Sequence, residues 1–339
     1  MKKILCALLS VVLGITMLFA VGCDNSQVEN GSVSVKYYAS ASDMLPMLKQ
    51  GNLTIGLLPE PAATQLTKIS TDKTWYRLDL QKLYDQETKA YPQAVMLVKE
   101  SLLNTYPDIV NKMANAFDGN VAWVKENVNL AVQAIGNCIE DGLTPSLTIK
   151  NLNADVVDGC KIYWQNALDA KKAVEDYVKD ITAIEPASAK EVSEDFFYNG
   201  SASGSFAKDT VTVVAPDGAP ALAIARFISE NENFGTNKIF NYKVVNSSKI
   251  GGAVNQGVGD IVIIPVNAAS KLYKANANDK YKLVSVVTHG NLYIMSTEKI
   301  DSVLELKDKT VGVIGQGLVP DLTFKAVLTK NSMHAIIAD

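Results

Sequence analysis

The residues best suited to contact a ligand are short polar side chains and glycines in the turns that follow apolar, strand-like segments. In open α/β sheets, ligands bind beyond the carboxyl ends of the strands, where helix N-termini present backbone N–H groups. The expected chemistry is therefore hydrogen bonding to a small molecule. The candidate ligand-binding residues are Asp217, Gly218, Asn246, Ser247, Ser248, Pro265, Asn267, His289, Gly315, Gln316, Gly317, Ser40, Ser42, Asp43, Pro59 and Glu60.

The same residue types also have structural uses. Ser42, Asp43 and Ser248 precede helical patterns, and serine and aspartate are common helix caps. Gly218 suits a tight turn whether or not a ligand is near. His289 lies in a connection between strands, where a histidine can equally serve as a structural hydrogen-bonding group. Both interpretations of these residues stay open at the level of the sequence.

Charged and catalytic side chains are scarce. The formal net charge is -4, which gives no electrostatic reason to expect a nucleic-acid partner. The only arginines are Arg77 and Arg226 and the only histidines are His289 and His334, so neither a nucleophile–base pair nor a metal cluster is visible. The glycines at 315 and 317 lack the third glycine of a dinucleotide fingerprint. We therefore expect no enzyme, no metal and no cofactor.

The polarity of the candidate residues bears on the class of ligand. The candidate walls contain no arginine, the side chain that carboxylate binders favour. Backbone N–H groups alone could hold an oxyanion. Asp43, Glu60 and Asp217 instead favour a neutral or hydrogen-bond-donating ligand. We expect a small heterocycle or an amide-bearing compound rather than nitrate or a sulfonate.

The amino-terminal segment is typical of a secretory signal peptide. A positively charged start precedes an apolar run over residues 4–21, and small residues follow. This pattern predicts a signal peptide at 1–22. The run is also close to the length of an uncleaved transmembrane anchor. Both alternatives place the rest of the chain outside the cytoplasm.

The end of the apolar run indicates a lipid anchor. The stretch Leu18-Phe-Ala-Val-Gly-Cys23 resembles a bacterial lipobox, in which the cysteine is diacylated, although Ala20 stands where leucine is usual. The resemblance implies lipidation at Cys23, followed by a polar tether over residues 23–32. The expected location is the outer face of the cytoplasmic membrane, or the periplasm.

Two internal repeats indicate the architecture. Residues 50–66 align without a gap with residues 256–272, an offset of 206 (256 minus 50), and share Gln, Gly, Ile, Pro, Ala, Ala and Leu. Residues 211–222 align with residues 311–322 at an offset of 100 (311 minus 211), with two valines, a proline and a leucine in common. The first repeat predicts strand–helix–strand–helix. The second predicts a strand, a glycine-bearing turn and a helix begun by proline.

One copy of each repeat makes a small α/β lobe with a largely parallel sheet. The copies within 210–280 are adjacent and form lobe I. The other copies lie at opposite ends of the chain, in 310–339 and 33–74, so lobe II is split between the two ends. This arrangement predicts that the strands Val35–Ala39 and Val311–Ile314 lie in the same sheet.

The remaining segments join the lobes. Strand-like stretches within 75–100 and 281–309 predict two crossovers. Apolar residues spaced three and four apart predict a helical segment over 101–199 that packs on lobe I, with one helix across 154–170. Glycine and serine at the start of 200–209 predict a flexible joint.

Two cysteines follow the signal region. Cys138 and Cys160 could form a disulfide in an oxidising exterior, or they could be two buried thiols on separate helices. Neither a CxxC motif nor a Cys/His spacing indicates a metal site.

Two similar α/β lobes joined by two crossings resemble the type II periplasmic binding proteins. Several motifs resemble the nitrate/sulfonate/taurine and thiamine-pyrimidine binding proteins of that family, namely Ala215-Pro-Asp-Gly-Ala-Pro220, Asn246-Ser-Ser-Lys-Ile-Gly-Gly252, Ile264-Pro-Val-Asn-Ala-Ala269, Val313-Ile-Gly-Gln-Gly317 and Gly56-Leu-Leu-Pro-Glu-Pro-Ala-Ala63. The resemblance implies the substrate-binding lipoprotein of an ABC importer, which captures a small molecule and delivers it to membrane permease subunits. Relative to the family, the order of the segments is circularly permuted, with the cut inside lobe II.

Alternatives to this interpretation stay open. A rearranged or truncated gene would give the same order of segments, and a second chain could complete lobe II in a domain-swapped dimer. At the level of function, the alternatives are an enzyme of the same two-lobed fold and a ligand-sensing surface lipoprotein.

Overall fold

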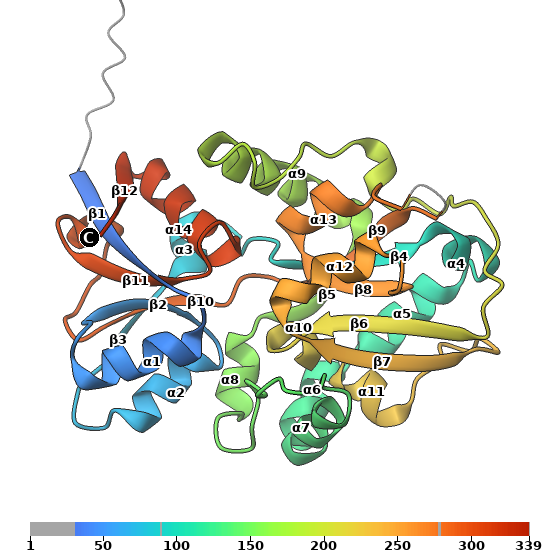
Figure 1. The fold of residues 1–339 in the computed structure, drawn as a ribbon, viewed down its shortest axis with the longest axis horizontal. Coiled ribbons are helices and arrows are strands. Elements are labelled where there is room, and N and C mark those ends of the chain that lie inside the picture. The colour runs from blue at the N-terminus through green and yellow to red at the C-terminus, as the bar shows by residue number, and fades with distance from the viewer. Residues whose placement is uncertain (1–30, 89, 277–278, 339) are drawn as a thin grey trace, which may run out of the picture.

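The computed structural model describes residues 31–88, 90–276 and 279–338. The predictions for the signal peptide, for Cys23 and for most of the tether lie outside these residues. The described chain is a mixed α/β structure with two six-stranded sheets, one on each side of a middle region through which the chain passes (Figure 1). We call them the terminal sheet and the central sheet, after the parts of the chain that form them.

The terminal sheet combines strands from both ends of the chain. In it, β1 is parallel to β11, with Tyr37 opposite Val313, and β11 is parallel to β2. The predicted pairing of strands from the two chain ends in one sheet is confirmed. The strands, in spatial order, are β12 (Met333–Ile337), β1 (Gly31–Tyr38), β11 (Thr310–Ile314), β2 (Ile55–Pro59), β10 (Leu292–Ser296) and β3 (Tyr76–Asp79).

The central sheet is formed from the middle of the chain. Here β6 is parallel to both β7 and β8, whereas β4 is antiparallel to β8. The strands, in spatial order, are β5 (Ile162–Asn166), β9 (Tyr281–Thr288), β4 (Ala94–Lys99), β8 (Ile261–Pro265), β6 (Thr210–Pro216) and β7 (Ile239–Val245).

The two sheets share one strand order. The sequence offsets match β1 with β7, β11 with β6, and β2 with β8, and these strands lie in the orders β1-β11-β2 and β7-β6-β8. In the terminal sheet, β2 pairs with the antiparallel strand β10, which pairs in turn with β3. In the central sheet, β8 pairs with the antiparallel strand β4, which pairs in turn with β9. The repeats in the sequence therefore correspond to repeated strand arrangements. Each sheet adds an edge strand of its own, β12 or β5.

The chain passes between the sheets at two places. Residues 80–93 lead from β3 in the terminal sheet to β4 in the central sheet, and residues 289–291 lead from β9 back to β10. The strands expected in the crossovers are all present. We call residues 289–291 the crossing segment.

Helices cover both sheets, and two of them carry a proline as their second residue, at Pro220 and Pro320, one position later than the predicted proline start. The helices near the terminal sheet are α1 (Ala41–Gln50), α2 (Ala62–Ile69), α3 (Leu80–Tyr84) and α14 (Val319–Lys330). Those that follow the strands of the central sheet are α10 (Ala219–Leu222), α11 (Ala225–Glu230), α12 (Ile250–Asn255) and α13 (Val266–Leu272).

The segment 101–199 is mainly helical, but the predicted helix across 154–170 is wrong. The chain forms α8 (Ala154–Gly159), turns at Lys161 with a φ of 50°, and continues as β5 on the edge of the central sheet. The aromatic residues Tyr163 and Trp164 favour a strand once β9 offers a partner. The other helices of this segment are α4 (Glu100–Thr105), α5 (Ile109–Phe117), α6 (Asn120–Glu126), α7 (Val128–Asn137) and α9 (Ala167–Ile184).

Helix α9 links the two halves of the molecule. It packs on α13 and β9 of the central half and also on α14 of the terminal half. The hydroxyl groups of Tyr177 in α9 and Thr323 in α14 are hydrogen-bonded at 2.7 Å, and the ring of Tyr177 stacks on that of Tyr91. One continuous apolar cluster includes Val35 of the terminal sheet and Val95 of the central sheet. On this side the halves share a core.

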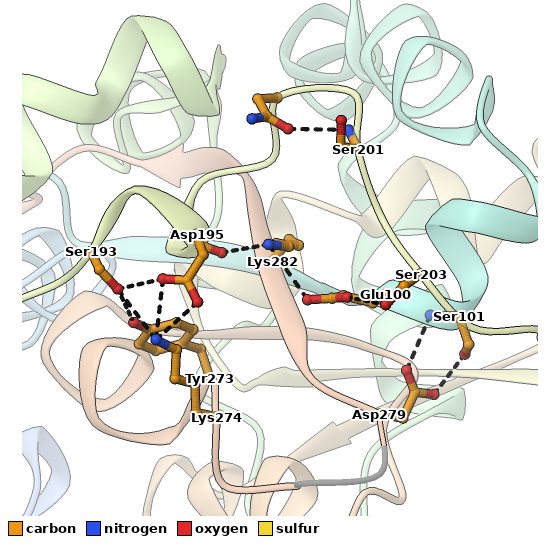
Figure 2. A network of polar contacts seen from close by, with 11 residues as sticks. Glu100, Ser101, Ser193, Asp195, Ser201, Ser203, Tyr273, Lys274, Asp279 and Lys282 are labelled. Atoms are coloured by element: carbon orange, nitrogen blue, oxygen red, sulfur yellow. Dashed lines mark hydrogen bonds and ion pairs between the residues drawn. The ribbon is translucent and has the colours of Figure 1, made fainter.

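The segment predicted as a flexible joint follows a path set by specific contacts (Figure 2). The Ser203 hydroxyl donates to Glu100 Oε2 at 2.7 Å, and Asn104 Nδ2 donates to the Gly204 carbonyl at 2.7 Å. Nearby, Ser101 donates through both its backbone N–H and its hydroxyl to the carboxylate of Asp279. These contacts fasten residues 200–205 to the start of α4.

Cys138 and Cys160 are both free thiols in this structure. Burial raises the pKa of the Cys160 thiol. Among the described residues there is no helix of the length and apolarity that a membrane span requires.

Candidate functional site

The candidate residues gather in turns at the carboxyl ends of the strands. At the ends of β6 and β7, the Asp217 N–H donates to the Val245 carbonyl at 3.0 Å, which places Asp217 beside Asn246. The Asp217 carboxylate accepts from the backbone N–H groups of Ser146 and Gly218. The side chain of Asn246 accepts from Ser248. Asp217 therefore ties its turn to the segment that contains Ser146, whereas Asn246 bonds within its own turn. Asn246, Ser247 and Ser248 remain exposed to solvent.

A second group lies at the ends of β1 and β11. Ser40 caps α1 by accepting from the Asp43 N–H. The Gly315 N–H donates to the Tyr38 carbonyl, which brings the two turns side by side. Gly315 and Gly317 have φ angles of 66° and 71°, which favour glycine. The exposed side chain of Gln316 lies in the turn after β11, and that of Ser42 lies at the start of α1.

Asn267 lies in the interior. It is the second residue of α13, two positions after Pro265, and it is 4% exposed. Its Nδ2 donates to the Ser188 carbonyl at 3.3 Å. This amide joins α13 to the segment after α9.

Glu60 is 2% exposed and forms an ion pair with Arg77, whose side chain is 34% exposed, and the sequence did not reveal this pair. Its Oε1 lies 2.6 Å from Arg77 Nη2 and also accepts from the Thr64 hydroxyl. Its Oε2 accepts from the Thr64 backbone N–H. The Arg77 guanidinium lies 3.4 Å from the centre of the Tyr293 ring. The expectation of a site without arginine is therefore wrong at Glu60. Arg77 lies on β3, which pairs with β10, and this pairing brings its side chain next to Glu60.

The two halves of the molecule touch at this ion pair. The Tyr293 hydroxyl donates to the Gly159 carbonyl of α8 at 3.1 Å. A Cβ added at Gly159 would lie 2.8 Å from Glu60 Cγ, so only a glycine allows this approach. We call Glu60, Arg77, Tyr293 and Gly159 the α8 contact. It lies between the halves as α9 does, but it depends on a few polar groups.

His289 is buried in the crossing segment, 3% exposed. Its ring stacks on that of Tyr163, with centroids 3.4 Å apart, and its Nε2 lies 3.1 Å from Gln165 Oε1. Burial lowers the pKa of His289 to about 3, so the imidazole is neutral at ordinary pH. The next residue, Gly290, has a φ of 66°, and an added Cβ would lie 2.5 Å from the Tyr91 ring.

Asn291 completes the crossing segment, the stretch His289-Gly290-Asn291 that the sequence places in a predicted crossover within reach of the ligand. It exchanges backbone and side-chain hydrogen bonds with Glu60: the Glu60 N–H donates to the Asn291 carbonyl at 3.0 Å, and Asn291 Nδ2 donates to the Glu60 carbonyl at 3.3 Å. Within the part of the chain that the structure describes, Asn291 Oδ1 and His289 Nδ1 are buried without a hydrogen-bond partner. Only the position of Asn291 beside His289 in a predicted crossover could have drawn attention to it.

Two open grooves lie elsewhere on the surface. One, of about 410 Å³, is lined by β6, β7 and α12 and includes Ser248. The other, of about 440 Å³, lies at the amino ends of β2 and β11 and includes Lys36 and Lys309. Groups of acidic, histidine and cysteine side chains that could hold a metal ion are absent from the described residues. The arrangement is suited to hydrogen bonding between the sheets.

Comparison with known proteins gives little beyond this geometry. No protein-family model and no curated protein matches the chain. Among solved structures, the chain is similar to the oligopeptide-binding protein AppA from Bacillus subtilis, solved in complex with a nonapeptide. The identity is 10% and the TM-score 0.30, and the match covers 78% of this chain and 55% of that one, about half its length. Similarity at this level assigns neither a family nor a ligand.

Proposed function

We propose that the protein is the extracytoplasmic solute-binding component of an ABC importer, in which two lobes built on the terminal and central sheets capture a small organic molecule. The observation that carries this proposal is the shared strand order of the two sheets together with the two passages of the chain between them. Two equivalent units joined at two points can close around a ligand by a hinge motion.

The position of the polar turns supports binding between the lobes. In both sheets, parallel strands end in turns rich in glycine, serine, asparagine and aspartate, and ligand sites favour such strand ends and domain interfaces. The crossing segment and the α8 contact lie where the lobes meet. The bound molecule would then pass to the permease subunits of the importer.

The proposal is tested by the small molecule that the protein carries when purified from its own source. Native mass spectrometry of the protein, followed by denaturation and identification of the released compound, should give a single metabolite at near-equal stoichiometry. Deletion of the gene should abolish uptake of that compound. Turnover of the compound by the purified protein, or unchanged uptake in the deletion strain, would contradict a role in import.

Lipid anchoring at Cys23 is part of the same proposal. Two acyl chains hold a protein stably at a membrane, where one chain gives marginal binding. Changing Cys23 to Ala should move the protein from the membrane fraction to the soluble fraction, as read by fractionation and immunoblotting. A Cys23→Ser variant, which also lacks the thiol, should behave in the same way. If the variants stay membrane-embedded with residues 1–22 retained, the segment is a transmembrane anchor.

A further inference from the structure

Two buried acceptor atoms in the crossing segment bear on the chemistry of the ligand. The amide orientation of Asn291 is fixed because its Nδ2 donates to the Glu60 carbonyl, which leaves Oδ1 as the atom without a donor. Buried polar atoms are nearly always hydrogen-bonded, so an unpaired one in a folded protein indicates a missing partner.

The tautomer of His289 is fixed by a similar chain of contacts. Gln165 Nε2 donates to the Asp169 carbonyl, so its Oε1 is the atom that faces His289 Nε2. An oxygen acceptor at that position requires the proton on Nε2. Nδ1 is then a bare lone pair, and burial keeps the ring neutral. The crossing segment therefore presents two acceptors, His289 Nδ1 and Asn291 Oδ1.

The location of these atoms suits a ligand held between the lobes. The crossing segment joins the two sheets, and Asn291 is hydrogen-bonded to Glu60 of the α8 contact. Parting of Gly159 from Tyr293 would open this region on the side away from the core shared at α9. Closing the lobes again leaves the two acceptors buried, which is unfavourable unless a donor is enclosed with them.

We propose that His289 Nδ1 and Asn291 Oδ1 accept hydrogen bonds from a neutral ligand that carries N–H groups, of the amide or lactam class. This inference rests on the proposed function, because it requires a molecule enclosed between the lobes. An anion is disfavoured, since both atoms are lone-pair acceptors.

The test uses the full-length protein and pairs of compounds that differ only in their N–H groups. Uracil is compared with 1,3-dimethyluracil, and benzamide with N,N-dimethylbenzamide, with benzoate as the anionic probe. Binding is measured by titration calorimetry and by the shift in melting temperature. We expect the N–H compound of at least one pair to bind about tenfold or more tightly than its methylated partner, the loss that follows from removing a buried hydrogen bond.

Variants locate the effect at the crossing segment. Asn291→Ala should weaken binding of the N–H compound about tenfold and leave the methylated compound unaffected. Asn104→Ala is the matched control, because it also loses one amide donor to a backbone carbonyl but lies beside the joint at residue 204. His289→Phe, which keeps a ring against Tyr163 and removes Nδ1, should act like Asn291→Ala.

The outcomes separate this inference from the proposed function. Equal binding of the paired compounds, preference for benzoate, or binding indifferent to both variants would overturn the inference while leaving a solute-binding role intact. Absence of binding by every probe would overturn it too, since the compounds carry the donors it requires. The proposed function would then be judged by the copurified metabolite, and only its absence together with unchanged uptake would reject both.

Discussion

At the scale of single residues, buried polar groups decide what the candidate site can do. The sequence places Glu60 in a turn at the end of a predicted strand, yet in the fold Arg77 and Thr64 already occupy its carboxylate. Asp43 bonds within its own turn, and Asp217 bonds to Gly218 beside it and to Ser146 of another segment. The carboxylates therefore give little reason to infer a ligand class. His289 gives more, because its ring is enclosed and one of its nitrogens is unpaired.

The low pKa of His289 predicts a pH dependence of stability. The fold favours the neutral ring, so the contribution of His289 to the free energy of unfolding is greatest above its ordinary pKa of about 6.5. It should fall as the pH drops from 6.5 toward 3, with a slope approaching about 1.4 kcal/mol per pH unit. The measurement is urea denaturation of the wild type and of His289→Phe at several pH values.

A matched variant controls for the other groups that titrate in this range. His334 lies on β12 and is exposed, so His334→Phe should keep the wild-type dependence. His289→Phe should show a flatter decline than either. Parallel pH curves for all three proteins would mean that His289 titrates in the fold much as it does in the unfolded chain.

At the scale of helices and strands, the α8 contact and the α9 interface differ in kind. Around α9, Tyr84, Tyr91 and Tyr177 pack against one another, and Asp180 accepts from the Tyr84 hydroxyl and lies 2.9 Å from Lys330 Nζ. At α8, the halves meet through one hydroxyl-to-carbonyl hydrogen bond and the close approach of Gly159. The first is a core, whereas the second consists of a few contacts.

The close approach of α8 predicts the effect of a single methyl group. In Gly159→Ala the new Cβ would push against the buried side chain of Glu60, and the substitution should lower the free energy of unfolding by about 1–3 kcal/mol. Chemical denaturation with linear extrapolation measures this change. Part of the loss should be relieved by Glu60→Ala in the same chain, because the clash is with that side chain.

Gly136→Ala is the control for this substitution. Gly136 is exposed in α7, and a Cβ there would meet nothing within 4 Å. Alanine should stabilise that helix by about 0.5–1 kcal/mol. If both substitutions stabilise the protein equally, α8 does not press on Glu60 in solution.

The elements that could be predicted from the sequence are those with a repeated or periodic pattern. The strands of both sheets that lie within the two repeats were expected, because apolar runs ending in a proline or glycine turn recur at fixed offsets. β5 was missed because Ile162–Asn166 sits between alanine-rich helical patterns and becomes a strand only through pairing with β9. β12, at the very end of the chain, likewise depends on pairing with β1.

At the scale of the whole molecule, the pairing of β1 with β11 makes the order of segments intelligible. These strands come from opposite ends of the chain, yet they occupy the places that β7 and β6 occupy in the central sheet. The cost in loop-closure entropy of joining distant segments grows only logarithmically with length. The pairing of β1 with β11 was predictable from the repeats. The contacts of Arg77 and Asn291 were not, because they depend on how β3 and the crossing segment pack beside Glu60.

The asymmetry of the two contacts between the halves predicts how the molecule opens. Because the α9 side shares a core, the hinge should lie there, and ligand binding should close the α8 side. Hydrogen exchange read by mass spectrometry should show added protection with ligand at α8 and the crossing segment, with little change in α9 and α14. Small-angle scattering should show a smaller radius of gyration with the copurified metabolite than without it. Protection gained mainly at α9 and α14 would place the hinge on the opposite side, and equal radii with tight binding would argue against closure altogether.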